Sequence, residues 1–280
     1  MGMLSINTNV GALKAADAAY SVNKSMETSM QRLSTGKRIN SAIDDAAGLQ
    51  ISQRQEAEIR GFKQATKNAA DSQALLATAE GAMGEITNIL QRMRELAVQS
   101  ASGTMSTADR TALQSEVEAL ETEIDRIKDD TTWAGKQLLD KSENGSTGQF
   151  VFHVGPDASD TIRHTIPSFV QTAAAIGLAS TETVSTQTKA RAYITAIDQA
   201  ISNVSVEREQ AGAVMNRLDF TMANLSNMAT NLALAKGRIE DADFAAESAN
   251  LARTQVLQQA SMAMLAQANA SKQQILALFQ

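Results

Sequence analysis

The two prolines of this 280-residue chain, Pro156 and Pro167, lie close together and leave long stretches on either side without any proline. Because proline removes a backbone donor and breaks an α-helix, residues 1–155 and 168–280 can each hold very long helices. Aromatic residues make up only 4% of the chain, which argues against a β-sandwich or a doubly wound sheet. The sequence therefore predicts a mainly α fold.

An apolar stripe with alternating steps of three and four residues runs from Ile194 to Ile239, and only Arg208 and Lys236 interrupt it. Such a sustained heptad-like pattern predicts one coiled-coil-like helix of roughly ten turns or more. Its apolar face must pack on other helices of similar length.

Two shorter stripes precede it, from Leu76 to Ala97 and from Leu113 to Ile127. Between them Gly103 can end one helix, and Ser106 followed by Asp109 resembles a capping box that begins the next. The two stripes predict a helical hairpin that shares a core with the long helix after residue 194. Ser41 followed by Asp44 resembles another helix start.

Both ends of the chain also carry helical patterns, but of a different kind. Near the N-terminus the stripe consists largely of small residues, and residues 248–280 contain only Arg253 and Lys272 as charged side chains. A helix that is apolar on several sides suits burial better than a solvated surface. Burial in its own domain and burial against other copies of the chain both remain open, and the second is favoured because both termini share the character. The residues expected to make such assembly contacts are Leu257, Met264, Leu265, Ile275, Leu276, Leu278 and Phe279.

Between the helical stretches, residues 149–166 alternate as strand, turn and strand, which predicts a single small β-hairpin leaning on the helices. His153 and His164 could face each other across it. Two imidazoles without a third ligand make a weak metal site, and exposed strand positions are the favoured interpretation. Residues 168–188, rich in Ala, Ser and Thr, are expected to form a poorly packed connection.

Composition excludes several functions. The net charge of −6 disfavours a nucleic-acid partner, and the absence of cysteine removes disulfides and thiolate metal sites. No uncharged apolar run long enough for a membrane helix is present, so no membrane insertion is expected. Nothing near residue 1 resembles a cleaved signal, which fits a cytoplasmic protein or one exported with its N-terminus intact. No cofactor or catalytic arrangement is predicted, and the chain is expected not to be an enzyme.

Several long segments, in this order along the chain, resemble bacterial flagellin. They are LSINTNVGAL near the start, RLSTGKRINSAIDDAAGLQIS at 32–52, LQRMRELAVQSASGT at 90–104, NRLDFTMANLSN at 216–227 and RIEDADFAAESANL at 238–251. The resemblance covers about residues 1–140 and 190–280. It departs at WAGKQLL, from Trp133, where many members have an FNG-type sequence, and it lacks their large outer variable domains.

The resemblance implies a structural subunit that self-assembles into a homopolymeric helical filament for swimming motility. Residues 1–44 with 236–280 would form an inner-core helical domain that is disordered in the monomer. Residues 45–167 with 190–235 would form an outer tube including a β-hairpin at about 133–167, and 168–189 would be a remnant of the variable region. The implied route is unfolded, uncleaved export by a chaperone and the flagellar type III apparatus, then assembly at the distal tip beside cap and hook-junction proteins. The location is then extracellular.

The family resemblance also implies a recognition surface. LQRMRELAVQ matches the stretch read by the Toll-like receptor for flagellin, which would place Gln91, Arg92, Leu96 and Glu116 at that surface. A contact between subunits is the alternative role of this helix face. Two other functions stay open. The first is a hook–filament junction protein, although such proteins typically lack so close a match to LQRMRELAVQ. The second is a chemoreceptor-like cytoplasmic coiled coil, against which the β-hairpin argues.

Overall fold

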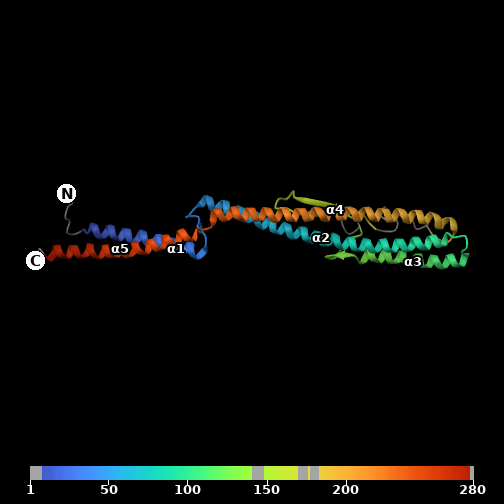
Figure 1. Cartoon of the computed structure of the whole chain (residues 1–280), viewed down its shortest axis with the longest axis horizontal. Coiled ribbons are helices and arrows are strands. Elements are labelled where there is room, and N and C mark those ends of the chain that lie inside the picture. Colours follow the sequence, from blue (N-terminus) through green and yellow to red (C-terminus); the bar gives the residue numbers. More distant parts are fainter. Residues whose placement is uncertain (1–7, 141–147, 170–175, 177–182, 278–280) are drawn as a thin grey trace. The chain divides into compact units, whose positions relative to one another are not determined.

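The computed structural model describes residues 8–140, 148–169, 176 and 183–277. Figure 1 shows a mainly α chain with short strands between the third and fourth helices, as the sequence predicts. The elements in order are α1 (Val10–Thr35), α2 (Ala46–Ser100), α3 (Thr107–Asp130), β1 (Thr132–Trp133), β2 (Lys136–Gln137), β3 (Gln149–His153), β4 (Thr161–Thr165), α4 (Gln187–Glu240) and α5 (Phe244–Ala277).

The chain divides into two compact units. Unit 1 comprises residues 1–59 and 230–280, and unit 2 comprises residues 60–229. Both divisions fall inside long helices, α2 and α4, and further from the chain ends than the predicted division at 44/45 and 235/236.

Unit 2 contains the main hydrophobic core, built from the apolar stripes of α2, α3 and α4. The predicted α2 stripe is fully buried, and α3 and α4 contribute the facing side chains. The core residues that the three helices share include Leu76, Ala79, Met83, Ile86, Leu90, Met93, Ala97, Val117, Ile124, Tyr193, Ile197, Val204, Ala211 and Leu218.

The tip of the helical hairpin confirms the predicted capping box. Ser106 Oγ accepts a hydrogen bond from the Asp109 amide, and the Asp109 carboxylate accepts one from the Ser106 amide. Hydrogen bonds from the Ser106 hydroxyl and amide lower the pKa of Asp109. The guanidinium of Arg110 donates to the carbonyls of Ser100, Ser102 and Met105, so the turn's carbonyl groups keep partners.

The polar interruptions of the long α4 stripe have acidic partners on α2. Within unit 2, Arg208 donates to Glu80 Oε1 at 2.6 and 3.0 Å. The buried Tyr193, which directly precedes this stripe on α4, donates its hydroxyl to Glu121 of α3 at 2.7 Å. Burial raises the pKa of Glu121, which fits a half-buried carboxyl at a helix interface.

The predicted β-hairpin is present as β3 and β4, but its histidines do not face each other. His164 lies opposite Phe150 and His153 lies opposite Thr161. His153 is exposed, whereas His164 is buried and its pKa is lowered by burial, so the expected exposure of His164 is wrong. The hairpin packs on α2, where the Asn68 amide donates to the His153 carbonyl at 3.2 Å.

The sequence missed a second hairpin, formed by β1 and β2. Its two turn residues, Ala134 and Gly135, both have positive φ angles, of 50° and 80°. This is the type I′ geometry that a two-residue hairpin loop favours, and glycine adopts it without strain. Because the first turn position holds alanine in place of the usual asparagine, aspartate or glycine, the sequence does not show the common signature of this turn.

Residues 170–175 and 177–182 of the connection before α4, which is expected to be poorly packed, lie outside the described residues, but three of its described residues are buried. Phe169, Ile176 and Val184 are each fully buried in the core of unit 2. The Ser100 hydroxyl donates to the Val184 carbonyl, and the Val184 amide donates to Gln114 Oε1 at 2.7 Å. Widely spaced apolar anchors in a polar segment carry no periodicity, which is why sequence patterns did not reveal them.

Candidate assembly and recognition surfaces

In unit 1, α1 and α5 pack against each other in antiparallel orientation (Figure 1). The Asn9 amide donates to the Ala268 carbonyl at 3.1 Å near one end of the pair. Gln258 donates to Asn23 at 2.7 Å in the middle, and Arg32 lies 3.7 Å from Glu247 at the other end. The small residues of the α1 stripe therefore face α5, as close helix packing requires.

Unit 1 has few buried apolar residues and many exposed ones. Among the described residues of unit 1, only Ala19, Ile39 and Ile59 are buried hydrophobic residues, whereas unit 2 holds all the others. Of the seventeen large apolar side chains that are exposed in the described part of the chain, twelve lie in unit 1. A core of so few buried apolar residues supplies little free energy to offset the entropy of ordering the chain. Large exposed apolar surfaces of this kind are typical of interaction sites, which makes α1 and α5 the candidate assembly surface.

The predicted assembly residues are distributed on α5 as follows. Leu257 and Met264 are 45% and 64% exposed, and Leu265 is partly exposed. Ile275 and Leu276 belong to the end of α5, but their side chains lie outside the described part, as do residues Leu278 and Phe279 altogether.

Sequence reasoning missed further members of this apolar surface. On α1 these include Leu13 and Tyr20, exposed by 58% and 73%. They are seven residues apart and so share one helix face, opposite the small-residue stripe. This seven-residue spacing is the sequence signal that could have revealed the exposed apolar face of α1. On α5, Val256 and Met262 are also more than half exposed.

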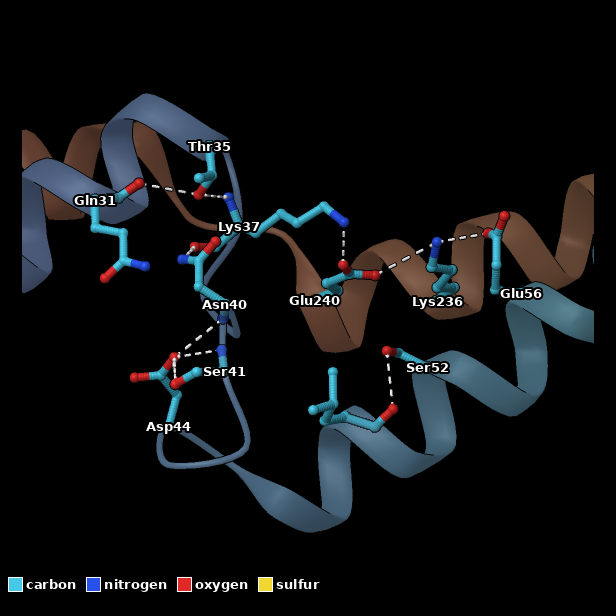
Figure 2. Close-up of polar contacts among 11 residues, drawn as sticks. Gln31, Thr35, Lys37, Asn40, Ser41, Asp44, Ser52, Glu56, Lys236 and Glu240 are labelled. Carbon is cyan, nitrogen blue, oxygen red and sulfur yellow. Dashed lines mark hydrogen bonds and ion pairs between the residues drawn. The ribbon is translucent and has the colours of Figure 1, made fainter.

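The loop between α1 and α2 has a defined conformation (Figure 2). Gly36 ends α1 in the left-handed region, with φ of 71°. The Asp44 carboxylate accepts hydrogen bonds from the Asn40 amide at 3.0 Å and from the Ser41 amide at 2.9 Å. These bonds lower the pKa of Asp44, that from Ser41 most strongly.

The predicted helix start at Ser41 and Asp44 is wrong, because these residues form a turn ahead of α2. Asp45 precedes the helix and accepts a hydrogen bond from the Gly48 amide at 2.8 Å. Asp45 is therefore the residue that caps α2. Asp44 and Asp45 are adjacent acidic residues, and the Ser41–Asp44 spacing matched the capping pattern although Asp45 is the residue that caps the helix.

An ion network joins this loop to the end of α4 (Figure 2). Glu240 is 7% exposed and accepts a hydrogen bond from Lys37, while Lys236 Nζ lies 3.4 Å from its other oxygen. Lys236 also donates to Glu56 of α2 at 2.7 Å. Burial alone would raise the pKa of Glu240, but hydrogen bonds and charges from Lys37 and Lys236 outweigh it and lower the pKa. The second polar interruption of the α4 stripe is thus also paired with α2.

Three of the four residues that the sequence places at a receptor surface are exposed. Gln91 and Arg92 of α2 and Glu116 of α3 are exposed. Arg92 donates to Glu116 at 2.8 and 3.2 Å and to Glu95 at 2.9 Å, and these hydrogen bonds raise the pKa of Arg92.

Leu96 does not belong to that surface. It is 1% exposed and lies in the core of unit 2, because it follows Met93 by three residues on the buried face of α2. Its placement at the receptor surface is therefore corrected to a core position.

No group of three or more His, Asp or Glu side chains that could hold a metal ion occurs among the residues that the structure describes. In the same part of the chain, no helix is long and apolar enough to cross a membrane.

Comparison with known proteins shows which family the chain resembles along most of its length. The model of the bacterial flagellin N-terminal helical region matches residues 6–144, and that of the C-terminal helical region matches residues 194–279. A flagellin of Halalkalibacterium halodurans is 42% identical over 274 residues, with 98% of each chain covered. A flagellin of Bacillus subtilis is 38% identical, with 98% of this chain and 99% of the relative covered. The crystal structure of Bacillus cereus flagellin, 31% identical, aligns with a TM-score of 0.50 over 61% of this chain and 94% of that one.

Proposed function

Because the chain belongs to the bacterial flagellin family and is a structural subunit of the flagellar filament, we propose that α1 and α5 form the contacts that hold the filament together from within. The observation that carries this proposal is the concentration of exposed apolar side chains on unit 1, beside almost no buried ones. A homopolymer supplies identical apolar helices as partners, so each subunit covers the surface of its neighbours.

In the free subunit, α1 and α5 are then disordered, and they order as they dock. The large apolar side chains of both helices lose contact with water only in the polymer. Unit 2 folds alone on its own core and forms the outer tube. Residues 168–189 stand where longer flagellins carry variable domains.

The remaining partners are the proteins that export such a subunit and add it to the filament. The chain leaves the cell unfolded and uncleaved through the flagellar export apparatus, with a chaperone bound beforehand, and adds at the distal tip beneath a cap protein. Its work is structural and needs no enzymatic activity. A hook–filament junction role is not favoured, because the relatives matched over nearly their full length include flagellins.

Purified subunit mixed with short filament seeds tests the assembly proposal. We expect electron microscopy to show growing filaments for the wild-type chain and strongly reduced growth for Met264→Gln, which removes an exposed apolar contact from α5. Met228→Gln, which changes an exposed methionine of unit 2, serves as the matched control and should retain growth. A wild-type chain that stays monomeric with seeds would overturn the proposal.

We further propose that Gln91, Arg92 and Glu116 form a surface that a Toll-like receptor reads on the monomer. The supporting geometry is the ion pair that joins α2 to α3 and holds the Arg92 guanidinium in one place. A planar, fixed guanidinium is a frequent centre of binding energy at protein interfaces. In the filament the same face serves for contacts between subunits, so the receptor meets the monomer.

Arg92→Ala is expected to weaken receptor activation by the monomer by about tenfold or more, as loss of a central arginine does at interfaces. Arg126→Ala is the matched control, because Arg126 is similarly exposed and also pairs with two carboxylates, Glu123 and Asp130. A cell-based receptor assay with monomeric protein measures both. Equal signalling by wild type and Arg92→Ala would remove the receptor proposal.

A further inference from the structure

The side of α4 that lies opposite the core of unit 2 carries an exposed aromatic residue. Phe220 is 78% exposed, more than any other large apolar side chain described in unit 2. The buried Leu218 and Leu225 lie on the other side of the same helix. Six exposed residues at helical spacings of three or four share the side of Phe220 and form what we call the Phe220 face: Ala213, Asn216, Phe220, Ala223, Asn224 and Asn227.

The Phe220 face lacks the charged side chains that normally solvate an exposed helix. No charged residue occurs from Phe220 to Ala235, and Arg217 lies at the edge of the face. The exposed side of α3 shows the ordinary composition, because Arg126 forms ion pairs there with Glu123 and Asp130. The absence of charge is therefore a property of this part of α4 and not of the helices of unit 2 in general.

Three asparagines stand where charged residues would be expected. Asparagine is among the less favourable residues in a helix, because its short amide competes for backbone hydrogen bonds. The side-chain amides of Asn216, Asn224 and Asn227 make no hydrogen bond to any residue that the structure describes. An aromatic side chain among small residues and amides, with charges excluded, is typical of the centre of a protein interface. The composition thus indicates a contact surface.

We propose that the Phe220 face is a further contact surface of the filament, and that a second copy of this chain covers it. This inference rests on the proposed assembly of the subunit, and it adds a contact made by unit 2. Every copy carries a net charge of −6, so two copies approach at the least electrostatic cost through faces without charge. The helix that carries the face also leads directly to α5, which carries the contacts proposed above.

The Phe220 face does not depend on the order of α1 and α5. It belongs to a helix whose other side is packed in the core of unit 2, through Leu218 among others. The face is therefore formed in the folded part of the free subunit. Assembly changes only its exposure, which is high in the monomer and low in the filament.

A single cysteine tests this change of exposure, since the chain contains no cysteine of its own. Asn224→Cys places a thiol on the Phe220 face, and Thr122→Cys places one at an exposed position of α3 as the control. Each full-length variant is copolymerised with an excess of wild-type chain, and its rate of reaction with a maleimide is measured in monomer and filament. The Asn224→Cys thiol should react at least about tenfold more slowly in the filament, because a covered thiol is not accessible to the reagent. The Thr122→Cys thiol should keep most of its monomer rate.

The rate of growth on wild-type seeds gives a second readout. Phe220→Gln should slow growth by at least about tenfold, as loss of an aromatic anchor does at interfaces. Phe220→Leu keeps an apolar side chain and should retain more of the growth rate. Met228→Gln changes a residue about 80° around the helix from Phe220 and should grow like the wild type. Because Phe220 is exposed, the melting temperature of the monomer should stay the same in both Phe220 variants.

Either of two results, obtained while wild-type filaments grow normally, would overturn this inference alone. One is an Asn224→Cys thiol that reacts as fast in the filament as in the monomer, and the other is growth of Phe220→Gln at the wild-type rate. Slowing of both thiols by the same factor would contradict the assignment of the contact to this face. A wild-type chain that forms no filaments on seeds would instead overturn the assembly proposal, and the inference would fail with it.

Discussion

Removal of residues 261–280 is expected to abolish filament growth while leaving the melting temperature of the subunit unchanged. The deleted segment contains Met262, Met264, Leu265, Ile275, Leu276, Leu278 and Phe279. Each contributes about 1.5–3 kcal/mol if it becomes fully buried in the polymer. The free energy lost with several such contacts in every subunit exceeds the binding free energy of an ordinary reversible interface. The core of unit 2 contains none of these residues, so its unfolding transition stays in place.

Leu90→Ala is the opposing control, because Leu90 is fully buried in unit 2. A leucine-to-alanine change in such a core costs about 2–5 kcal/mol, and the melting temperature should fall clearly while growth on seeds persists at low temperature. Seeded growth followed by light scattering, together with calorimetry of the monomer, measures both variants. A truncated chain that forms normal filaments, or one that melts much earlier than the wild type, would refute the assignment of α5 to assembly.

The architecture of unit 2 could be predicted from sequence largely because its helices bury complete stripes. The α2 stripe from Leu76 to Ala97 and the α4 stripe as far as Leu218 are both found in the core. Arg208 and Lys236 were visible as interruptions, but their partners Glu80 and Glu56 lie more than a hundred residues away and follow no local pattern. Three-dimensional packing alone brings them together.

Several features that the sequence did not reveal depend on single residues without periodicity. Phe169, Ile176 and Val184 anchor a polar connection, and Ala134 takes a backbone conformation usually given to asparagine or glycine. The family resemblance places Leu96 at the receptor surface, but its position three residues after Met93 puts it on the buried face of α2. His153 and His164 were paired by alternation, whereas the actual register depends on the length of the loop between the strands.

The sequence indicated that the terminal helices expose an apolar surface, but it indicated only some of the exposed residues. An α5 sequence with almost no charge indicated an apolar partner, and Leu257 and Met264 are indeed exposed. The outer face of α1 went unnoticed, because the small residues that pack on α5 dominate its pattern. A helix that carries contact residues on two faces shows no single dominant apolar stripe in its sequence.

Amide hydrogen exchange of the wild-type chain, compared between monomer and filament, tests the central claim most directly. The account predicts that amides of α1 and α5 exchange in the monomer at nearly unprotected rates and become protected by orders of magnitude in the filament. Amides of α2, α3 and α4 in the core of unit 2 should be protected in both states. Protection of α1 and α5 in the monomer equal to that of unit 2, or no gain of protection on polymerisation, would contradict it.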